Sequence, residues 1–531
     1  MKHYVLLIFA ALLISKTSTA QNTNKAKPNI LLICVDDLRN NLGAYGDTQA
    51  ITPNIDALAK QGVIFRNHQV QYAVCGPSRA ALTTGLMPEE TGVIGFKPIR
   101  RKLPDLTFLP EYFKNNGYIT AAAGKIHDPR TVGNPKNKSK DGDDVASWSI
   151  PYLAPKGGHK AKNMALDFQD LPEEKYVDGI IRVKGIKLLE KVAKEDKPFF
   201  MAIGFKKPHE PFIAPKKYWD LYNNTNFKIA ENQNAPIGRD DLKTYTLKGK
   251  DVKQNMNPRT GLINEDFQLK LKQGYYACTS FVDAQIGIII DKLEKLGVAN
   301  NTIIVLWGDH GLFLGEHGRW NKHSNLEVAS SSPLIIFDPR NPKAKGNTFA
   351  AVSTVDIYPT LCELAGLATP EQPQNAKKNT GRNIKGRSLV PILNDTDAQV
   401  KIGAITVYRG QRGLGYGYRI KGKYRYIEWV KKGKEIFYEL YDYEIDPNET
   451  RNLAVVEKEA YAPLLHKFSR NIRSFGEADG CKALLRKKPY QLKDKSRILV
   501  RDADGDGIPD DKEAKGDTDG DGIPNYLDAK N

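Results

Sequence analysis

Two pairs of potential cation ligands each follow an apolar run of the kind that forms a buried strand. Asp36-Asp37 comes directly after residues 29–35, and Gly308-Asp309-His310-Gly311 comes directly after residues 302–307. In α/β enzymes, sites lie at the carboxyl ends of the sheet strands. Adjacent carboxylates suit a hard cation, although the histidine weakens the preference for Ca²⁺ over zinc. Taken alone Asp36-Asp37 also fits a solvated turn, so the prediction of a cation site depends on the two strand ends converging.

Cys75-Gly76-Pro77-Ser78-Arg79 contains a thiol, which is a potential nucleophile, four residues before an arginine. If this segment is helical, Cys75 and Arg79 lie on one face of the helix. The pentapeptide alone also fits a buried cysteine before a proline-started helix, with Ser78 as its cap. Both interpretations stay open on these residues.

Three further elements place basic residues after predicted strands. They are Gly124-Lys125-Ile126-His127 after residues 118–123, Lys207-Pro208-His209-Glu210-Pro211-Phe212 after the strand that ends at residue 205, and Gly315-Glu316-His317-Gly318-Arg319-Trp320-Asn321-Lys322 beyond the second cation pair. Any one of these lysines or histidines has an ordinary structural explanation. Five elements that each lie at a strand end or in the following loop indicate one site.

The segment Cys75 to Arg79, continued by Ala80-Ala81-Leu82-Thr83-Thr84-Gly85, resembles the signature at which type I sulfatases convert a cysteine to formylglycine. The resemblance runs from residue 27 to about residue 453, in family order, and is closest to the iduronate-sulfatase-like branch. It implies hydrolysis of sulfate esters by a hydrated aldehyde. It also implies a formylglycine-generating maturation enzyme as partner, and one active-site Ca²⁺ bound by Asp36, Asp37, Asp309, His310 and the modified Cys75.

The same resemblance implies roles for the basic residues. Arg79 would steady the aldehyde hydrate, and Lys125 would hold the nucleophile and sulfate oxygens, with His127 oriented on the hydrate. Lys322 would bind sulfate, and His209 would be the general acid for the leaving oxygen. One hydroxyl of the hydrate would attack sulfur, and the second would then expel sulfate.

Residues 1–20 read as a secretory signal, with a basic start, an apolar run and small residues before Gln21. No segment is long and uncharged enough to span a membrane, for which about 20 residues are needed. We therefore expect a secreted or periplasmic protein. Five cysteines form no disulfide framework, and their odd number leaves at least one thiol unpaired.

The predicted fold class is α/β, with strands and helices alternating through the first two-thirds of the chain. The resemblance implies an alkaline-phosphatase/sulfatase-like fold, in which helices sandwich a large mixed sheet. Short β-rich runs from about residue 404 predict a smaller C-terminal antiparallel subdomain. We divide the chain into a signal peptide (1–20), a catalytic domain (27–395), a C-terminal subdomain (396–490) and an acidic tail (491–531).

The tail contains a repeat of 15 residues that resembles thrombospondin type 3 calcium repeats. Its predicted ligands to further Ca²⁺ ions are Asp502, Asp504, Asp506, Asp510 and Glu513 in the first copy and Asp517, Asp519, Asp521, Asn525 and Asp528 in the second. Residues 502–531 hold ten acidic residues against three lysines, so the net charge of +17 becomes +24 for the rest of the chain. Because the chain outside the tail is basic and has no nucleic-acid-binding motif, we expect its partner to be an extracellular polyanion rather than nucleic acid.

The leading hypothesis is a Ca²⁺-dependent sulfatase acting on a sulfated carbohydrate. Likeness to iduronate sulfatases suggests a uronate-containing polymer, either a glycosaminoglycan or an algal polysaccharide such as ulvan. One alternative is a phosphoester or phosphonate hydrolase of the same fold. The other is a non-catalytic, calcium-dependent extracellular binding protein, against which the intact Cys75 and its basic neighbours argue.

Overall fold

A computed structural model of the chain describes residues 27–132, 143–375, 380–420, 422–474 and 476–493. The predicted signal segment and the calcium ligands of the acidic tail lie outside these residues. Within them, no helix has the length and apolar character needed to cross a membrane.

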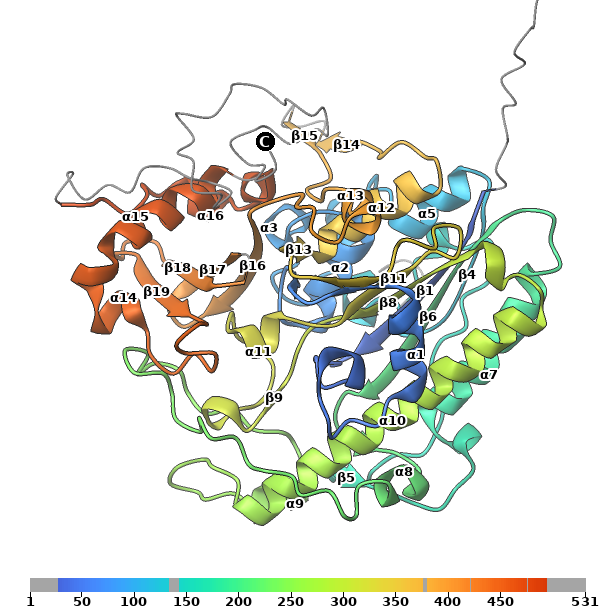
Figure 1. The fold of residues 1–531 in the computed structure, drawn as a ribbon, viewed down its shortest axis with the longest axis horizontal. Coiled ribbons are helices and arrows are strands. Elements are labelled where there is room, and N and C mark those ends of the chain that lie inside the picture. The colour runs from blue at the N-terminus through green and yellow to red at the C-terminus, as the bar shows by residue number, and fades with distance from the viewer. Residues whose placement is uncertain (1–26, 133–142, 376–379, 421, 475, 494–531) are drawn as a thin grey trace, which may run out of the picture.

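A seven-stranded mixed sheet forms the centre of the molecule (Figure 1). Its strands, in order across the sheet, are β12 (Gly346–Thr348), β2 (Val63–Phe65), β11 (Leu334–Phe337), β8 (Thr302–Gly308), β1 (Asn29–Asp36), β6 (Phe199–Pro208) and β4 (Ile119–Gly124). The four strands β8, β1, β6 and β4 are parallel, and β11 runs antiparallel to both of its neighbours. Their near-continuous apolar sequences are those of strands buried on both faces.

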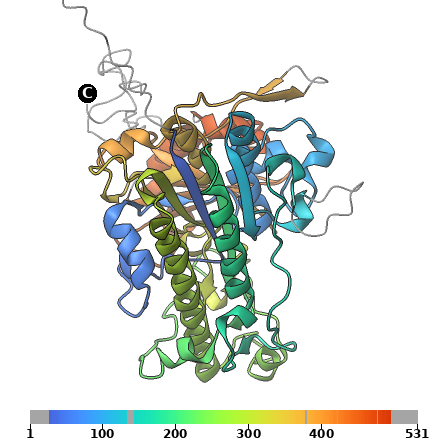
Figure 2. The same ribbon diagram turned by 90° about the vertical axis from the view of Figure 1, so that its right-hand side faces the viewer.

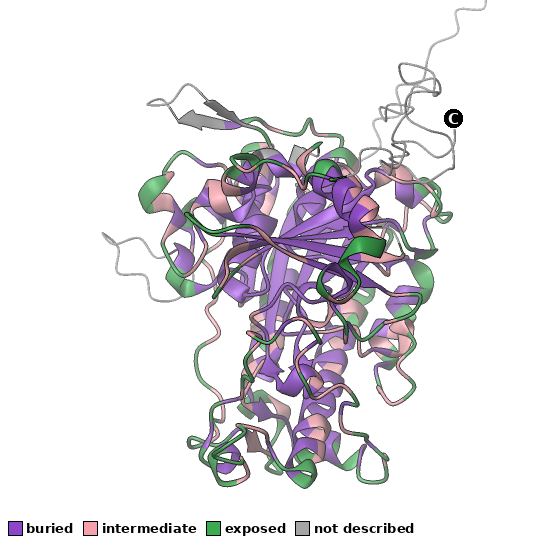
Figure 3. Ribbon diagram, turned by 90° about the vertical axis from the view of Figure 1, so that its left-hand side faces the viewer, coloured by how far each residue is buried: buried purple, intermediate pink, exposed green. Residues whose placement is uncertain are grey.

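Helices cover both faces of this sheet. Successive residues of β1 point to opposite faces, so its continuous apolar sequence places apolar side chains on each face. Ile30, Leu32 and Cys34 pack with α2 (Cys75–Thr84), α5 (Leu109–Asn115) and α12 (Ile357–Leu364). Leu31, Ile33 and Val35 pack on the other face with α1 (Pro53–Gln61), α7 (Val177–Val192) and α10 (Glu265–Lys295). Figure 2 shows α7 and α10 side by side, and Figure 3 shows the central strands buried between the layers. The predicted fold class is confirmed.

A separate antiparallel sheet follows, as predicted, with β16 (Gly403–Gly410), β17 (Gly413–Ile420), β18 (Tyr424–Val430) and β19 (Phe437–Asp442) in sequence order. The helix α15 (Lys458–Ser474) packs on it through Leu465 and Phe468. The shorter helices of the described chain are α3 (Pro88–Thr91), α4 (Ile99–Lys102), α6 (Pro129–Val132), α8 (Lys216–Asp220), α9 (Lys250–Gln254), α11 (Glu327–Ser330), α13 (Val390–Asn394), α14 (Leu453–Val456) and α16 (Lys482–Leu485). All five cysteines are buried and unpaired.

A buried ion cluster joins the two parts of the fold. Lys401, just before β16, lies 2.7 Å from a carboxylate oxygen of Asp356 and also pairs with Glu477. All three side chains are nearly inaccessible to solvent. Removing one partner from a buried cluster leaves the other charges unpaired in a medium of low dielectric.

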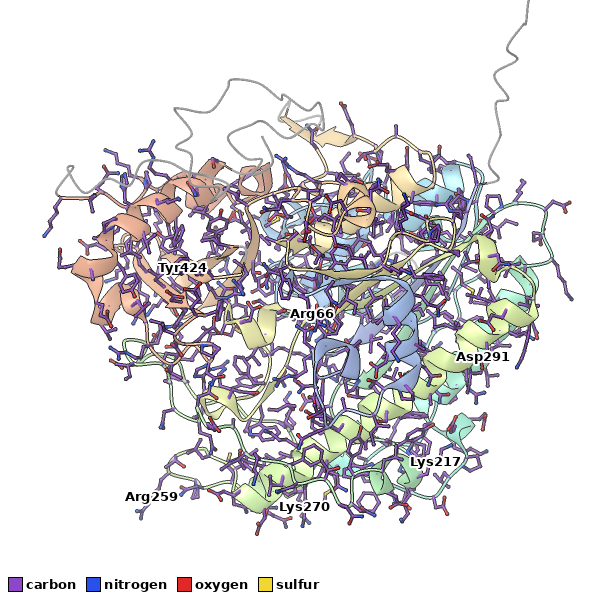
Figure 4. The ribbon with its side chains drawn as sticks, in the orientation of Figure 1. Arg66, Lys217, Arg259, Lys270, Asp291 and Tyr424 are labelled. Carbon is purple, nitrogen blue, oxygen red and sulfur yellow. The ribbon has the colours of Figure 1, made fainter. Side chains whose placement is uncertain are left out.

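We expect Lys401→Met to lower the free energy of unfolding by about 3–5 kcal/mol, because two carboxylates would stay buried without their cation. The matched control is Lys423→Met. Lys423 directly precedes Tyr424, which is labelled in Figure 4, and its Nζ lies 5.2 Å from the centroid of the Tyr424 ring. Lys423 pairs with Glu444 at the surface, where an ion pair contributes about 0–1 kcal/mol. Urea denaturation of both variants measures the difference, and equal losses would contradict the assignment.

Candidate active site

The ends of β1 and β8 meet at one edge of the central sheet. Val35 pairs with Gly308 in the parallel ladder, so Asp36 and Asp37 lie beside Asp309 and His310. The backbone N–H of Asp37 donates a hydrogen bond to Asp309 Oδ1 (2.9 Å), and that of Asp309 donates to the carbonyl of Val35 (3.1 Å). Asp37 has a positive φ of 60°, which turns the chain sharply at the strand end. The structure thus brings together the two cation pairs selected from the sequence.

Cys75 is the first residue of α2 and faces these ligands. Its Sγ lies 3.3 Å from His310 Nε2 and 3.9 Å from Asp37 Oδ1. The helix begins earlier than we expected, because Val74 occupies the N-cap position and makes no side-chain cap. The interpretation of Ser78 as a cap is therefore wrong: it lies inside the helix, and its hydroxyl donates to the carbonyl of Asp309 (2.5 Å).

Three cations balance the three carboxylates of the site. Arg79 donates from Nε to Asp309 Oδ2 (2.9 Å) and from Nη2 to Asp36 Oδ1 (3.4 Å). Lys125 Nζ lies 2.5 Å from Asp36 Oδ2, and Lys322 Nζ lies 2.6 and 2.8 Å from the two oxygens of Asp37. All these side chains are buried or nearly so, which makes each pairing electrostatically strong.

The electrostatic environment lowers the pKa of Asp36 and Asp37, whereas burial raises the pKa of Asp309 and of the Cys75 thiol. Burial raises the pKa of Asp37, but His209 and Lys322 outweigh it and bring that pKa to about 2. Burial raises the pKa of Asp36 as well, and Lys125 and His209 lower it to well below its ordinary value. Burial and the neighbouring Asp36 raise the pKa of the Cys75 thiol well above its ordinary value. Without a bound cation, this environment therefore disfavours the thiolate form of Cys75.

The two histidines differ in their contacts. His209 follows β6, and one of its ring nitrogens lies within 4.8 Å of ligand atoms of Asp36, Asp37 and Cys75. Its Nδ1 is 2.6 Å from the carbonyl of Glu210, so the ring donates from Nδ1 and leaves Nε2 for another partner. Burial lowers the pKa of His209 to about 4. His127 is also buried, and its Nε2 has no hydrogen-bond partner among the described residues.

A cavity of about 680 Å³ extends from these groups toward the surface. Asp36, Lys125, His127 and His209 are among the residues that line it. Further basic residues also line it, namely Arg130, His159, Lys160, Lys206 and Lys207. This volume lies within the range of about 300–1,000 Å³ that is typical of small-molecule sites. The cavity can therefore hold an anionic ligand larger than a single sulfate.

Gly124 positions Lys125 where β4 approaches β6. Gly124 has a φ of +83°, and a Cβ there would lie 2.0 Å from the carbonyl oxygen of Gly204. We expect Gly124→Ala to destabilise the protein by about 2 kcal/mol or more, since a backbone atom would have to move and L side chains disfavour this conformation. Gly117→Ala is the control, because its φ is +89° but nothing lies within 4 Å of the added Cβ. Thermal unfolding of both variants separates the clash from the conformational cost, and equal losses would refute the clash.

Two structural supports of the site have no signal in a single sequence. Tyr275, in the middle of α10, donates its hydroxyl hydrogen to the carbonyl of Asp37 (3.0 Å) and accepts the N–H of Arg39 (3.0 Å). Asn321 donates to Glu210 (3.2 Å) and so links the loop of Lys322 to that of His209. Only the tertiary fold brings Tyr275 to the site, whereas Asn321 and Glu210 lie in elements already selected from the sequence and only their hydrogen bond was unforeseen.

The donors present fit a hard divalent cation. Ligand atoms of Asp36, Asp37, Cys75 and His209 all lie within 4.8 Å of one another, and so do those of Cys75, Asp309 and His310. Three of these six residues are carboxylates, which suits a hard cation such as Ca²⁺, whereas the two histidines and the cysteine suit softer metals.

Comparisons with known proteins agree with this geometry. The family model described as sulfatase matches residues 28–367, and the model described as N-sulphoglucosamine sulphohydrolase, C-terminal, matches residues 315–477. Iduronate 2-sulfatase of Mus musculus is 36% identical over 413 residues, covering 68% of this chain and 73% of that protein. A sulfatase of Formosa agariphila is 35% identical over 493 residues, covering 85% of this chain and 88% of its own. The solved structure of the protein BT4656 in complex with its substrate D-glucosamine-2-N,6-O-disulfate superimposes on this chain with a TM-score of 0.64. The two chains are 23% identical, and the match covers 88% of this chain and all of BT4656.

Proposed function

The chain belongs to the sulfatase family and is a sulfuric ester hydrolase, and we propose that it removes sulfate from a sulfated, uronate-containing polysaccharide or its oligosaccharides. The observation that supports this most directly is the buried Cys75 between Asp37 and His310. Its sulfur lies within 4.8 Å of ligand atoms of Asp36 and His209, and these two residues line a large cavity together with several basic residues. The positive net charge of the chain also suits a polyanionic substrate.

Conversion of Cys75 to formylglycine is part of the proposal. Burial and Asp36 raise the pKa of the Cys75 thiol when no cation is bound, which disfavours its thiolate form, and a thiol in any case offers no second hydroxyl. The hydrated aldehyde would supply two hydroxyls, one to attack sulfur and one to expel sulfate afterwards. Ca²⁺ held by Asp36, Asp37, Asp309 and His310 would stabilise negative charge when bound.

The remaining residues of the site would act on the substrate itself. Lys125 and Lys322 would hold the sulfate oxygens, and the pairing of their ammonium groups with Asp36 and Asp37 near Cys75 supports this role. His209 would donate a proton to the departing alcohol oxygen. Negative charge of a bound sulfate favours the protonated imidazole, which offsets the effect of burial on its pKa. His127, at the cavity wall, would orient the nucleophile.

Two measurements test this proposal. Mass spectrometry of the tryptic peptide 67–79, from protein secreted together with a maturation enzyme, should show the thiol of Cys75 replaced by an aldehyde. Ion chromatography should then detect sulfate released from sulfated glycosaminoglycans or ulvan oligosaccharides. Matched phosphate and phosphonate esters serve as the counter-panel. An unmodified thiol, or faster cleavage of phosphorus esters than of any sulfate ester, would refute the proposal.

A further inference from the structure

A second cavity, of about 350 Å³, lies between the catalytic loops and the antiparallel sheet. Arg319, Tyr245 and His323 line it from the loops, while Tyr408 of β16 and Trp429 of β18 line it from the sheet. His323 follows Lys322 in the chain, and Lys322 contacts Asp37. Because consecutive Cα atoms are about 3.8 Å apart, this cavity begins close to the sulfate-binding lysine. It shares no lining residue with the larger cavity.

Arg319 is a buried cation without a carboxylate partner among the described residues. Its side chain donates to the carbonyls of Lys243 and His323, but its Nε has no hydrogen-bond partner there. Only 6% of the residue is exposed. The neighbouring Arg239 differs, because it pairs with Glu439 (2.7 Å) and Asp241 (2.9 Å).

The guanidinium of Arg319 lies over the rings of Tyr245 (5.7 Å) and Phe313 (5.4 Å), which offset part of its charge. A buried charge without a counter-ion nevertheless remains costly. Burial lowers the pKa of Arg319, and the neighbouring Arg239 lowers it further, while only the hydroxyls of Tyr408 and Tyr245 act in the opposite direction. The lining residues include three cationic side chains, those of Arg239, Lys243 and Arg319, and one carboxylate, that of Asp241. The cavity therefore carries excess positive charge, which an oxyanion would neutralise.

The cavity wall is also aromatic. The ring of His323 lies 5.2 Å from that of Tyr245 and 6.4 Å from that of Tyr408. Tyr245 is 40% exposed and offers an accessible ring surface. Aromatic rings with a polar edge provide apolar contact area together with hydrogen bonding, which suits the faces and hydroxyls of a sugar.

We propose that this cavity binds the anionic group, a carboxylate or a second sulfate, of the sugar residue adjacent to the one that carries the scissile sulfate. Arg319 would pair with that group, and Tyr245 and Tyr408 would contact the ring. This inference rests on the proposed function, and it makes the enzyme selective for a charged oligosaccharide over an isolated sulfated sugar. Arg319 is then a specificity residue that takes no part in sulfate ester cleavage.

The test compares Arg319→Met, which removes the charge at similar length, with Arg319→Lys, which keeps it. Arg412→Met is the matched control, because Arg412 pairs with Asp241 nearby and does not line the cavity. Each variant is assayed on a small aryl sulfate and on a sulfated oligosaccharide of alternating uronate residues. We expect Arg319→Met to lower kcat/KM about 10- to 100-fold on the oligosaccharide, mainly through KM, and Arg319→Lys to recover part of the loss. The aryl sulfate rate should stay within about twofold.

Two modified oligosaccharides identify the anion that Arg319 binds: one has the carboxyl group of the neighbouring sugar reduced, and the other lacks the sulfate of that sugar. Only the substrate that has lost the group bound by Arg319 should give the same kcat/KM with the wild type and with Arg319→Met. Equal losses on both substrates, or none on either, would overturn the inference. Calorimetric binding of the oligosaccharide to Cys75→Ala and to Cys75→Ala with Arg319→Met gives a test independent of turnover. If the wild-type protein cleaves no sulfate ester the proposed function fails, whereas unchanged affinity in the double variant rejects the cavity assignment alone.

Discussion

Cys75→Ala is expected to abolish sulfate release, with kcat at least about 10⁴-fold lower, while the fold stays intact. The side chain lies between Asp37 and His310 at the start of α2, and none of the other described residues offers a nucleophile that contacts both. Replacing a small buried thiol with a methyl group removes few contacts, so thermal unfolding should shift little. Steady-state sulfate release and circular dichroism measure the two effects.

Cys75→Ser separates the nucleophile from the need for two hydroxyls. Serine has a single hydroxyl, so it could accept sulfate but would have no second oxygen with which to expel it. We expect this variant to bind substrate and to release no more than one equivalent of alcohol per active site. Sustained multiple turnover by Cys75→Ser would contradict the proposed use of a hydrated aldehyde.

Much of the central sheet was predictable because its strands are continuous apolar runs between polar turns. The expected strands at residues 29–35 and 302–307 agree with β1 and β8 to within one residue at each end. Since the carboxyl ends of neighbouring parallel strands meet at one edge, the placement of Asp36, Asp37, Asp309 and His310 followed from these two strands.

The sequence did not allow us to predict which charged side chains of the site pair with one another. The guanidinium of Arg79 was expected beside the hydrate, and in the structure it is bound to Asp309 and Asp36. Lys322 reaches Asp37 across 285 positions of the chain, and nothing local in either segment encodes that contact. The left-handed conformation of Asp37 is likewise unusual for a non-glycine residue, and it is stabilised by tertiary hydrogen bonds.

The loops that shape the two cavities were recognisable only as irregular segments. The polar stretch 231–259 lacks periodicity, and the structure places Arg239, Lys243 and Tyr245 from it around the smaller cavity. Burial of Arg319 without an acid could not be inferred from its motif, because the compensating residues of a charge come from distant parts of the chain. Specificity therefore depends on tertiary contacts, while the reaction type is readable from local motifs.

Removal of divalent cations is the second change for which we expect a large effect. Treatment with EGTA should lower activity by at least about 100-fold, and added Ca²⁺ should restore it, since Asp36, Asp37 and Asp309 form an oxygen-rich ligand set around Cys75. Without the cation, the three carboxylates have only Arg79, Lys125 and Lys322 to balance them, and these lysines are then held away from sulfate.

The acidic tail complicates this experiment, because its repeats are predicted to bind calcium as well. A chain ending at Lys493 removes those repeats and keeps every described residue. If the active site holds the essential ion, the shortened and full-length proteins should lose and regain activity at the same free Ca²⁺ concentration. A shortened protein that is active and indifferent to EGTA would place the calcium requirement in the tail and refute the active-site assignment. Asp309→Asn in the shortened chain provides the converse test, since weakening the ligand set should raise the half-saturating Ca²⁺ concentration by at least about tenfold.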